Sequence, residues 1–368
     1  KKDGGSIEAK ISRFRHLSNI RYCCKNEAVF WLDGRNMDWT AAGTGMFGLE
    51  GTDAKAGNGA GAGVGGIRKV RWYPVKSQED AQALDFPSVG LLAKGQTLAG
   101  RGTGTLLSNI RLGASSVPGD GMIEKMYRDG GSRPYTEYLG IFCEVEGNIR
   151  NLTLKDPMLG LDDTREEEGN FLHLSGAGIL CGRSEGKLSD IKIQWTQKGQ
   201  KTVDVRLADR KETALENGSG KTCGIGGIVG LLAKKESDGS LTKLTDSEAD
   251  GIIMNGSVTG RLPKPEAVTD GMSAEEQAVQ YQYGIGGIFG YACLDGGVKV
   301  KACENHADVT GNLFTGGIGG YLDGSYRPPD DPETKDGDPG PGMTDCHSDG
   351  LVLCHSKVSH PEEMEGRY

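Results

Sequence analysis

Apolar and polar residues alternate over short stretches of this chain, and each stretch follows a glycine-rich segment. The apolar positions lie two or three residues apart, as in Ile149, Leu152 and Leu154, in Leu188, Ile191 and Ile193, and in Val298 and Val300. A period near two is typical of β-strands that bury one face and expose the other. The pattern therefore predicts an all-β protein made of many short strands.

A glycine–aliphatic segment recurs along the chain. It is Gly-Ile-Gly-Gly-Ile-Val-Gly at 224–230, Gly-Ile-Gly-Gly-Ile-Phe-Gly at 284–290 and Gly-Ile-Gly-Gly-Tyr-Leu at 317–322, with weaker copies at 90–93, 140–143 and 178–181. Aligned at Gly227, Gly287 and Gly320, the strong copies are 60 (287 − 227) and 33 (320 − 287) residues apart. Repetition of one supersecondary unit indicates a solenoid. We predict a parallel β-solenoid, or β-helix, with irregular coils, long inserted loops and an N-terminal cap.

The repeated residue types suggest how the coils turn and stack. The first glycine of each segment is expected to adopt positive φ at a sharp turn, and the second to let neighbouring coils approach without side chains. Asn255, Asn305 and Asp190 are expected at coil corners, where their side chains can bond to the backbone.

We divide the chain into an N-terminal cap with the first coils and a Gly-rich loop (1–88), a β-solenoid (89–355) and a C-terminal tail (356–368). The first segment is the most aromatic, which suits an end that must cover apolar edges. Its Leu-Ser-Asn-Ile-Arg pentapeptide at 17–21 returns at 107–111. This identity predicts that the cap is built from the same unit as the coils.

Polar, charged or Gly/Pro-rich segments interrupt the pattern at 50–66, 113–138, 160–172, 196–222, 261–282 and 327–342. In a solenoid, such insertions gather on one face or edge, and that face is often where binding occurs.

Composition narrows the possible partners. The chain has 36% hydrophobic residues and 60 glycines in 368 positions, so its core must be thin. Its net charge of −9 argues against a nucleic-acid partner. No run of eighteen apolar residues is present, so we expect neither membrane insertion nor a secretion signal within this stretch.

The nine cysteines are an odd number scattered over the chain, which does not suit a disulfide framework. Cys143 and Cys181 are expected at the same place in adjacent repeats, and so are Cys303 and Cys346. Equivalent positions in stacked strands lie about 4.8 Å apart. We expect reduced thiols that pack as small hydrophobes, although that spacing also permits a bridge.

The strongest metal candidates are Cys346-His347 and Cys354-His355, with His360 beyond them. Their spacing does not match compact zinc motifs, and solvated histidines with buried thiols are the alternative. The acidic segments 162–168 and 330–338 suit either structural calcium or a solvated loop. The Gly-x-Gly-x-x-Gly at 61–66 lacks the strand before it and the helix after it that a dinucleotide site needs. We therefore predict no metal and no cofactor, with structural calcium left open.

Two segments resemble a known family. Residues 302–311, Ala-Cys-Glu-Asn-His-Ala-Asp-Val-Thr-Gly, run into Gly-Gly-Ile-Gly-Gly at 316–320, and Asn-Gly-Ser-Val-Thr-Gly at 255–260 leads to Gly-Ile-Gly-Gly-Ile at 284–288. Both resemble the GLUG repeat of large secreted and wall-attached proteins of gut bacteria, closely over 223–325 and more loosely over 89–195. The resemblance implies a parallel β-solenoid in a modular surface protein. Such proteins are adhesin-like, or form the non-catalytic part of immunoglobulin-cleaving peptidases.

The sequence contains none of the G-x-S-x-G, H-E-x-x-H or papain-type catalytic signatures. We expect a non-catalytic binding or adhesion segment, extracellular or at a bacterial cell surface, whose signal and anchor lie outside this stretch. The resemblance suggests a host glycoprotein, an immunoglobulin included, or mucin glycan as the partner. Aromatic residues that dominate interfaces supply the candidate binding residues: Trp31, Trp39, Trp72, Tyr73, Tyr127, Tyr135 and Tyr138.

Two alternatives stay open. A β-helix polysaccharide lyase or glycoside hydrolase would use clustered charges, and two sets resemble such a cluster: Lys299, Lys301 and Asp308, and Lys187, Asp190 and Lys192. Outward charges on a strand explain the same residues. The chain would otherwise be a passive structural spacer.

Overall fold

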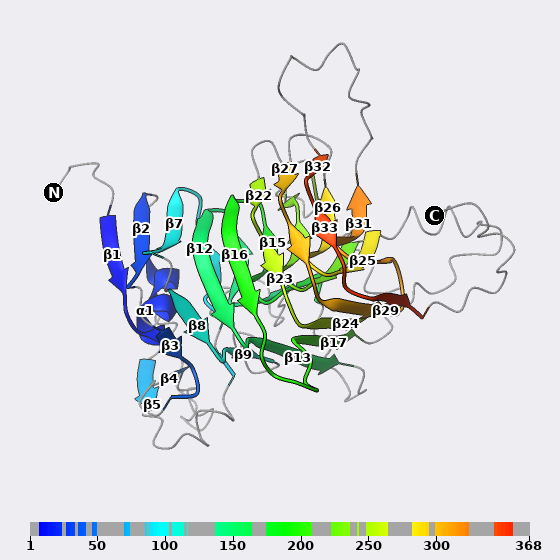
Figure 1. Cartoon of the computed structure of the whole chain (residues 1–368). Coiled ribbons are helices and arrows are strands. Elements are labelled where there is room, and N and C mark those ends of the chain that lie inside the picture. The colour runs from blue at the N-terminus through cyan, green and yellow to red at the C-terminus, as the bar shows by residue number, and fades with distance from the viewer. Residues whose placement is uncertain are drawn as a thin grey trace, which may run out of the picture.

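The structure is a stack of parallel β-coils that runs from the N-terminal to the C-terminal end of the molecule (Figure 1). It is a computed structural model. The described residues are 7–23, 27–33, 36–41, 46–49, 70–73, 85–86, 88–102, 105–113, 116, 137–163, 174–207, 222–235, 241–242, 248–263, 282–293, 299–323 and 342–355.

The largest sheet, sheet 1, faces the viewer in Figure 1 and has 13 strands. They are β1 (Ile7–Ile11), β2 (Ala28–Leu32), β3 (Asn36–Asp38), β7 (Gln96–Gly100), β8 (Leu106–Ser108), β12 (Asn148–Lys155), β16 (Leu188–Gln194), β22 (Glu248–Asp250), β23 (Ile253–Met254), β27 (Lys299–Lys301), β28 (Glu304–Asn305), β32 (Gly342–Thr344) and β33 (His347–Ser348).

Three smaller sheets complete the coils. Sheet 2 contains β9 (Arg111–Leu112), β13 (Met158–Asp163), β17 (Val203–Leu207), β24 (Ser257–Arg261), β29 (Asp308–Gly311) and β34 (Val352–Cys354). Sheet 3 contains β10 (Tyr138–Leu139), β14 (Gly176–Ala177), β18 (Thr222–Gly226), β25 (Gln282–Gly286) and β30 (Thr315–Gly316). Sheet 4 contains β6 (Leu91–Leu92), β11 (Phe142–Val145), β15 (Cys181–Ser184), β19 (Val229–Leu232), β26 (Phe289–Cys293) and β31 (Gly319–Asp323).

Each full coil visits sheets 1, 2, 3 and 4 in turn before it returns to sheet 1, and all pairings within these four sheets are parallel. The predicted parallel β-solenoid is confirmed. Two antiparallel pairs lie outside the coils, β4 (Met46–Leu49) with β5 (Val70–Tyr73) and β20 (Lys234–Lys235) with β21 (Leu241–Thr242). Strand β5 follows the glycines at 61–66 in the chain, where a dinucleotide site would need a helix.

The alternating apolar residues fill the interior in register. Ile149 pairs with Leu188, and Leu152 pairs with Ile191, and all four side chains are buried. The same pairing continues across the solenoid, so the apolar side chains form ladders that hold successive coils together.

A helical segment closes the N-terminal end. Helix α1 (Phe14–Ser18) and the 3₁₀ turn η1 (Asn19–Tyr22) lie beside β1 and β2, before sheets 2, 3 and 4 begin (Figure 1). Phe14 packs edge-on against Trp39 and Phe86, with ring centroids 5.2 and 5.8 Å away. The prediction that the cap reuses the coil unit is wrong here, because the pentapeptide at 17–21 is helical whereas its copy at 107–111 forms a strand, a corner and a strand.

One corner of the coil is a column of left-handed residues. Asn151, Asp190, Gly251, Ala302 and Asp345 occupy equivalent positions in five successive coils, with φ between 49° and 63°. Of the three residues predicted at corners, Asp190 lies in this column, because a short polar side chain tolerates the conformation. Asn255 and Asn305 lie outside it, between sheets 1 and 2, where their side chains bond to backbone groups as predicted. The Asn151 and Asn255 amides also donate to backbone oxygens of the preceding coil, those of Gly100 and Ile193.

The first glycine has the expected positive φ in the weak copy at 90–93, where Gly90 has φ 92°, but not in the strong copies. Among the described residues of the three strong copies, none has a φ in the left-handed region. A Cβ at Gly226 would instead lie 2.0 Å from the Val229 oxygen and 2.6 Å from the Ile288 oxygen, and one at Gly230 would lie 2.3 Å from the Ala177 nitrogen. Glycine therefore permits backbone contact between sheets 3 and 4 and between coils, as expected for the second glycine only.

The third copy is displaced by three residues from its predicted alignment. Gly286 pairs with Gly316 and Tyr291 pairs with Tyr321, so Gly287 is equivalent to Gly317 and not to Gly320. The last interval is thus 30 residues (317 − 287). The sequence Gly-Ile-Gly-Gly at 317–320 is the same as in the earlier copies, and it therefore concealed the true register. In the structure Gly287 lies directly against Gly317, since a Cβ at Gly287 would be 2.1 Å from the Gly317 oxygen.

Two predicted interruptions contain strands. Residues 160–163 belong to β13, and residues 203–207 form β17 in the middle of the segment 196–222. Short alternation such as Val203, Val205 and Leu207 is hard to recognise within polar surroundings. Of the remaining interruptions, 50–66 lies between β4 and β5, and the others lie between strands of sheets 2 and 3 or of sheets 4 and 1.

The cysteine prediction is right for one pair and wrong for the other. Cys303 and Cys346 lie in register in adjacent coils, as expected. Cys181 instead pairs with Phe142 in the interior, while Cys143 belongs to a separate apolar cluster with Tyr138 and other side chains near sheets 3 and 4. The eight cysteines of the described residues form no disulfide.

Candidate binding surface

The outer face of sheet 1 carries the most distinctive cluster of side chains. Trp31 on β2 pairs with Ala99 on β7, and Ala99 pairs with Arg150 on β12, so the three residues form one row across neighbouring strands. Because Ala99 is small, the long Arg150 side chain can reach across it toward Trp31. Arg101, which follows β7, joins them from the next position along the chain.

Both guanidinium groups lie over the indole. The Arg101 Cζ is 4.9 Å and the Arg150 Cζ 5.8 Å from the centroid of the Trp31 ring, within the range of cation–π attraction. Both arginines are exposed, and Trp31 is half-buried beneath them. Among the described residues neither guanidinium has a carboxylate within ion-pair distance. The cluster, which we call the Trp–Arg site, therefore presents two positive charges that are not neutralised locally.

The Trp31 indole N–H does not add to these donors. Its Nε1 is buried and has no hydrogen-bond partner among the residues described. A buried donor without an acceptor costs roughly 1–3 kcal/mol. An oxygen-rich ligand at the Trp–Arg site would therefore meet the donors and positive charge of the two guanidiniums.

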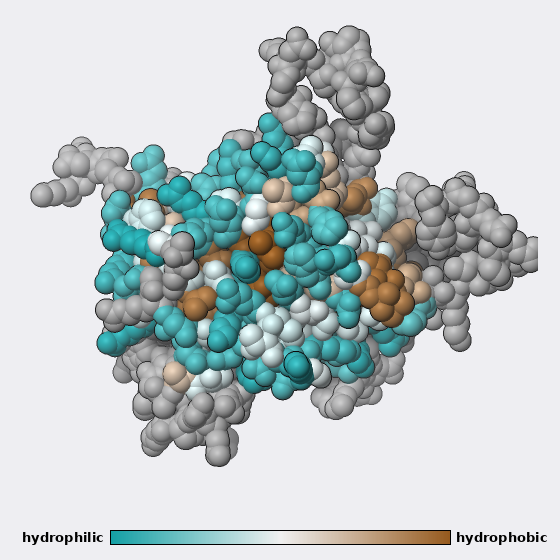
Figure 2. Space-filling model, viewed as in Figure 1, coloured by the Kyte–Doolittle hydropathy of each residue, from teal (hydrophilic) through white to brown (hydrophobic). Residues whose placement is uncertain are grey.

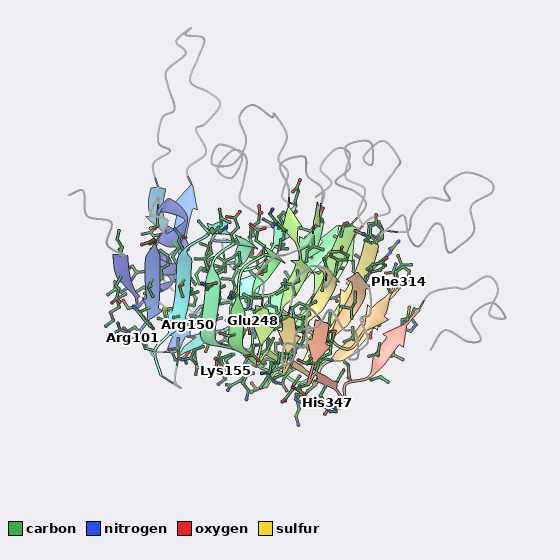
Figure 3. All side chains as sticks on the ribbon, turned by 90° about the horizontal axis from the view of Figure 1, so that it is seen from above. Arg101, Arg150, Lys155, Glu248, Phe314 and His347 are labelled. Carbon is green, nitrogen blue, oxygen red and sulfur yellow. The ribbon has the colours of Figure 1, made fainter. Side chains whose placement is uncertain are left out.

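The C-terminal half of the same face has a different charge pattern. Glu248 pairs with Lys299, and Asp250 pairs with Lys301, so opposite charges lie directly across neighbouring strands. In Figure 3, Arg101, Arg150 and Lys155 lie along one side of the solenoid toward the N-terminal end, and Glu248 follows them. The unneutralised charge is thus concentrated over the first coils.

The structure distributes the seven predicted binding residues unevenly. Trp31 forms the Trp–Arg site, whereas Trp39, in the main core, and Tyr138, in the separate apolar cluster with Cys143, are only 3% and 4% exposed. Trp72 and Tyr73 lie in β5, with side chains outside the described part, and Tyr127 and Tyr135 lie outside the described residues altogether.

Arg101 and Arg150 were not predicted. They lie 70 (101 − 31) and 119 (150 − 31) positions from Trp31 in the sequence. Only the parallel register brings them to Trp31, so no local motif could have identified them. The small Ala99 between two large outward residues is the one signal, and it becomes visible once the strands are aligned.

A second charged cluster has a structural role. Arg183 on β15 is 2% exposed, and its guanidinium donates to Glu144, Glu185 and the Ala233 carbonyl. Burial by itself lowers the pKa of this guanidinium, but Glu144, Tyr138 and Glu185 raise the pKa by more, so the net shift is upward. Arg183 is therefore permanently charged, and it ties neighbouring coils together on the outside of sheet 4.

The proposed metal residues do not converge. Cys346 points into the solenoid and donates to the Thr344 carbonyl, while His347, Cys354 and His355 are exposed, and no group of three potential ligands exists within the described ranges. His360, the acidic segment 330–338 and most of 162–168 lie outside those ranges, as does the glycine segment 61–66.

The last two coils share a histidine–carboxylate contact. His306 Nδ1 lies 2.8 Å from Asp349 Oδ1, and its Nε2 lies 3.2 Å from Glu304 Oε2. The hydrogen bonds to Asp349 and then to Glu304 raise the pKa of His306, and the same contact lowers the pKa of Asp349.

The two charged sets of the enzymatic alternative lie on exposed outer positions. Lys299 and Lys301 flank the buried Val300 on β27, and Asp308, on β29 of sheet 2, accepts a hydrogen bond from the Leu351 N–H. Of the second set, Asp190 and Lys192 lie on β16, with Asp190 at the left-handed corner, and Lys187 directly precedes the strand. Exposed outer positions account for both sets.

Comparisons with known proteins add nothing to this picture. No family model, curated protein or solved structure matches the chain. The similarity of 302–311 and 255–260 to the GLUG repeat therefore stays a prediction. Within the described residues, no helix has the length and apolar character needed to cross a membrane.

Proposed function

We propose that the chain is a non-catalytic binding segment of a bacterial surface protein, and that it recognises an acidic group on a host glycoprotein or mucin glycan. The Trp–Arg site carries this proposal, because two exposed guanidiniums, without a carboxylate partner among the described residues, lie on the outer face of sheet 1. The resemblance stated above supports the surface location and the host ligand.

The chemistry of the site favours carboxylate or sulfate. A guanidinium offers a planar fork of N–H donors that matches two oxygens of such a group. Stacking on Trp31 limits the motion of both forks, so less entropy is lost when they bind. Hydrogen bonds to charged groups contribute about 1.5–3 kcal/mol each.

The test is direct binding of acidic oligosaccharides, carboxylated and sulfated, to the chain, with neutral counterparts beside them. We expect Arg101→Gln and Arg150→Gln each to weaken binding by roughly tenfold or more. Lys192→Gln is the matched control, because Lys192 is exposed on the same sheet away from Trp31. Its removal is expected to leave affinity nearly unchanged.

Several results would oppose the proposal. Equal binding of neutral and acidic sugars would remove the role of the arginines. Equal losses in all three variants would mean diffuse attraction to positive charge, which salt screens, and not a defined site. Release of product from an acidic polysaccharide would overturn the non-catalytic part.

A further inference from the structure

Two cysteines occupy the same position in the last two coils that the structure describes. Glu304 pairs with His347 directly after them, so Cys303 and Cys346 are equivalent, 43 residues apart (346 − 303). The His347 N–H also donates to the Cys303 oxygen at 2.9 Å. Among the described cysteines, no other two are register partners in adjacent coils.

The two side chains have the same orientation. Each cysteine directly follows a left-handed corner residue of the column described above. The Cys303 Sγ lies 3.4 Å from the Lys301 oxygen, and the Cys346 Sγ lies 3.4 Å from the equivalent Thr344 oxygen. One thiol therefore repeats the other at the spacing of neighbouring strands, about 4.8 Å. A disulfide can bridge Cα atoms at that separation.

The two thiols differ in exposure. Cys303 is fully buried, whereas Cys346 is half-buried. Cys346 belongs to the last described coil, whose Leu351 is 58% exposed. In Figure 2 a brown area lies at the right of the view, where Figure 1 places β29 and the last strands. A small solute from the solvent therefore meets Cys346 before Cys303.

The contact between the thiols also makes them chemically different. Their mutual hydrogen bond lowers the pKa of Cys346, and the same bond together with burial raises the pKa of Cys303. Cys346 is therefore the thiol that ionises first, and the thiolate is the reactive form of cysteine. An accessible thiolate beside a second thiol is the usual arrangement of a redox-sensitive site.

We propose that Cys303 and Cys346 are a redox modification site, which a peroxide oxidises reversibly to a disulfide. The Cys346 thiolate attacks one oxygen of hydrogen peroxide, the O–O bond breaks, and Cys346 becomes a sulfenic acid. The hydroxide that leaves takes up the proton released by Cys346 and becomes water.

In the second step the Cys303 sulfur attacks the Cys346 sulfur. The S–S bond forms, the S–O bond breaks, and the hydroxyl leaves as a second water with the proton of Cys303. The two thiols thus lose two electrons, which reduce one peroxide to two waters. A small thiol reverses the change by exchange and is itself oxidised to a disulfide. The bridge ties the last described coil to the coil before it.

Limited oxidation of the full chain with hydrogen peroxide tests the proposal. After alkylation of the remaining thiols and digestion without reductant, mass spectrometry should find peptides joined through Cys303 and Cys346, which separate on reduction. Cys303→Ser should abolish the joined pair and leave a sulfenic acid at Cys346, which dimedone traps. Cys354→Ser is the matched control, because it removes the exposed thiol of the same coil. It should leave the joined pair unchanged.

This control also decides which thiol is joined, because trypsin leaves Cys346 and Cys354 in one peptide. Circular dichroism checks that each variant keeps its fold, and the mapping on the unmodified chain depends on no variant.

Hydrogen exchange gives an independent readout. The His347 and Asp349 amides donate to the preceding coil, and after oxidation they should exchange at least about tenfold more slowly, because the bridge limits opening of the last coil. The amides of Ile7–Ile11 should not change.

Four results would overturn the proposal. They are a reduced Cys346 beside an oxidised Cys354, a joined pair that disappears in Cys354→Ser, conversion of Cys346 to sulfinic acid without a bridge, or equal exchange before and after oxidation.

Discussion

The two ends of this solenoid differ in how their apolar residues are covered. At the N-terminal end α1 and η1 lie where three of the sheets have not yet begun, and Leu17 and Ile20 are almost completely buried. At the C-terminal end the described residues provide no such cover, and Leu351 is 58% exposed. A stack of coils buries each rung against its neighbours, so only its ends need additional structure. Among the described residues, a helical segment covers one end, whereas the other end exposes apolar side chains.

The largest expected difference between the ends concerns their leucines. Leu17→Ala should lower the free energy of unfolding by about 2–5 kcal/mol, because Leu17 is fully buried and its loss leaves a cavity. Leu351→Ala should change it by less than about 0.5 kcal/mol. Urea unfolding followed by tryptophan fluorescence measures both losses. Equal losses would show that the last coil is as well packed as the first.

A smaller difference is expected for equivalent glycines inside the solenoid and at its open end. A Cβ at Gly287 would lie 2.1 Å from the Gly317 oxygen, whereas one at Gly317 would lie 2.1 Å from Ser348 Oγ, on an exposed side chain. Gly287→Ala should therefore lower the free energy of unfolding by about 1–3 kcal/mol. Gly317→Ala should lower it by less, because the exposed Ser348 side chain in the last coil can move away.

Thermal unfolding of the two glycine variants, beside the unmodified chain, measures this difference. A larger loss of thermal stability in Gly317→Ala than in Gly287→Ala would mean that the terminal coil is held rigidly. It would contradict the expectation that this coil is the less tightly packed one.

The smallest effect should come from the histidine contact of the last two coils. The pKa of His306 is raised above its usual 6.5, so its contribution to stability is present at lower pH and is lost as pH rises through the folded-state pKa. The pKa of Asp349 is lowered below 3.8, so its contribution is lost again in strong acid. At mildly acidic pH, the amides of Val352–Cys354 should therefore exchange faster in His306→Gln than in the unmodified chain.

The β1 amides serve as the control, because the N-terminal end has no equivalent contact among the described residues. The comparison must be made between the two chains at each pH, since exchange itself depends on pH. A difference that grew toward alkaline pH would have the wrong sign and would contradict the assignment.

Much of the fold could be predicted from the sequence because its signals are local. Alternation at Ile149, Leu152 and Leu154 identified a buried strand, and the asparagines and aspartates identified corners. Register was harder, because the glycines at 316–320 allow two alignments and only contact between coils selects one. The Trp–Arg site could be predicted only in part. Trp31 was predicted as a binding residue, but its arginines come from other coils.

The repeated pentapeptide Leu-Ser-Asn-Ile-Arg separates what sequence and tertiary structure each decide. In both copies the sequence determined burial, since Leu17, Leu107, Ile20 and Ile110 are all at most 2% exposed. Tertiary structure alone decided their conformation. At 107–111, β8 lies between β3 and β12, whose backbones supply its hydrogen bonds. The copy at 17–21 lies at the end of the stack and forms a helical segment, which can satisfy much of its backbone internally.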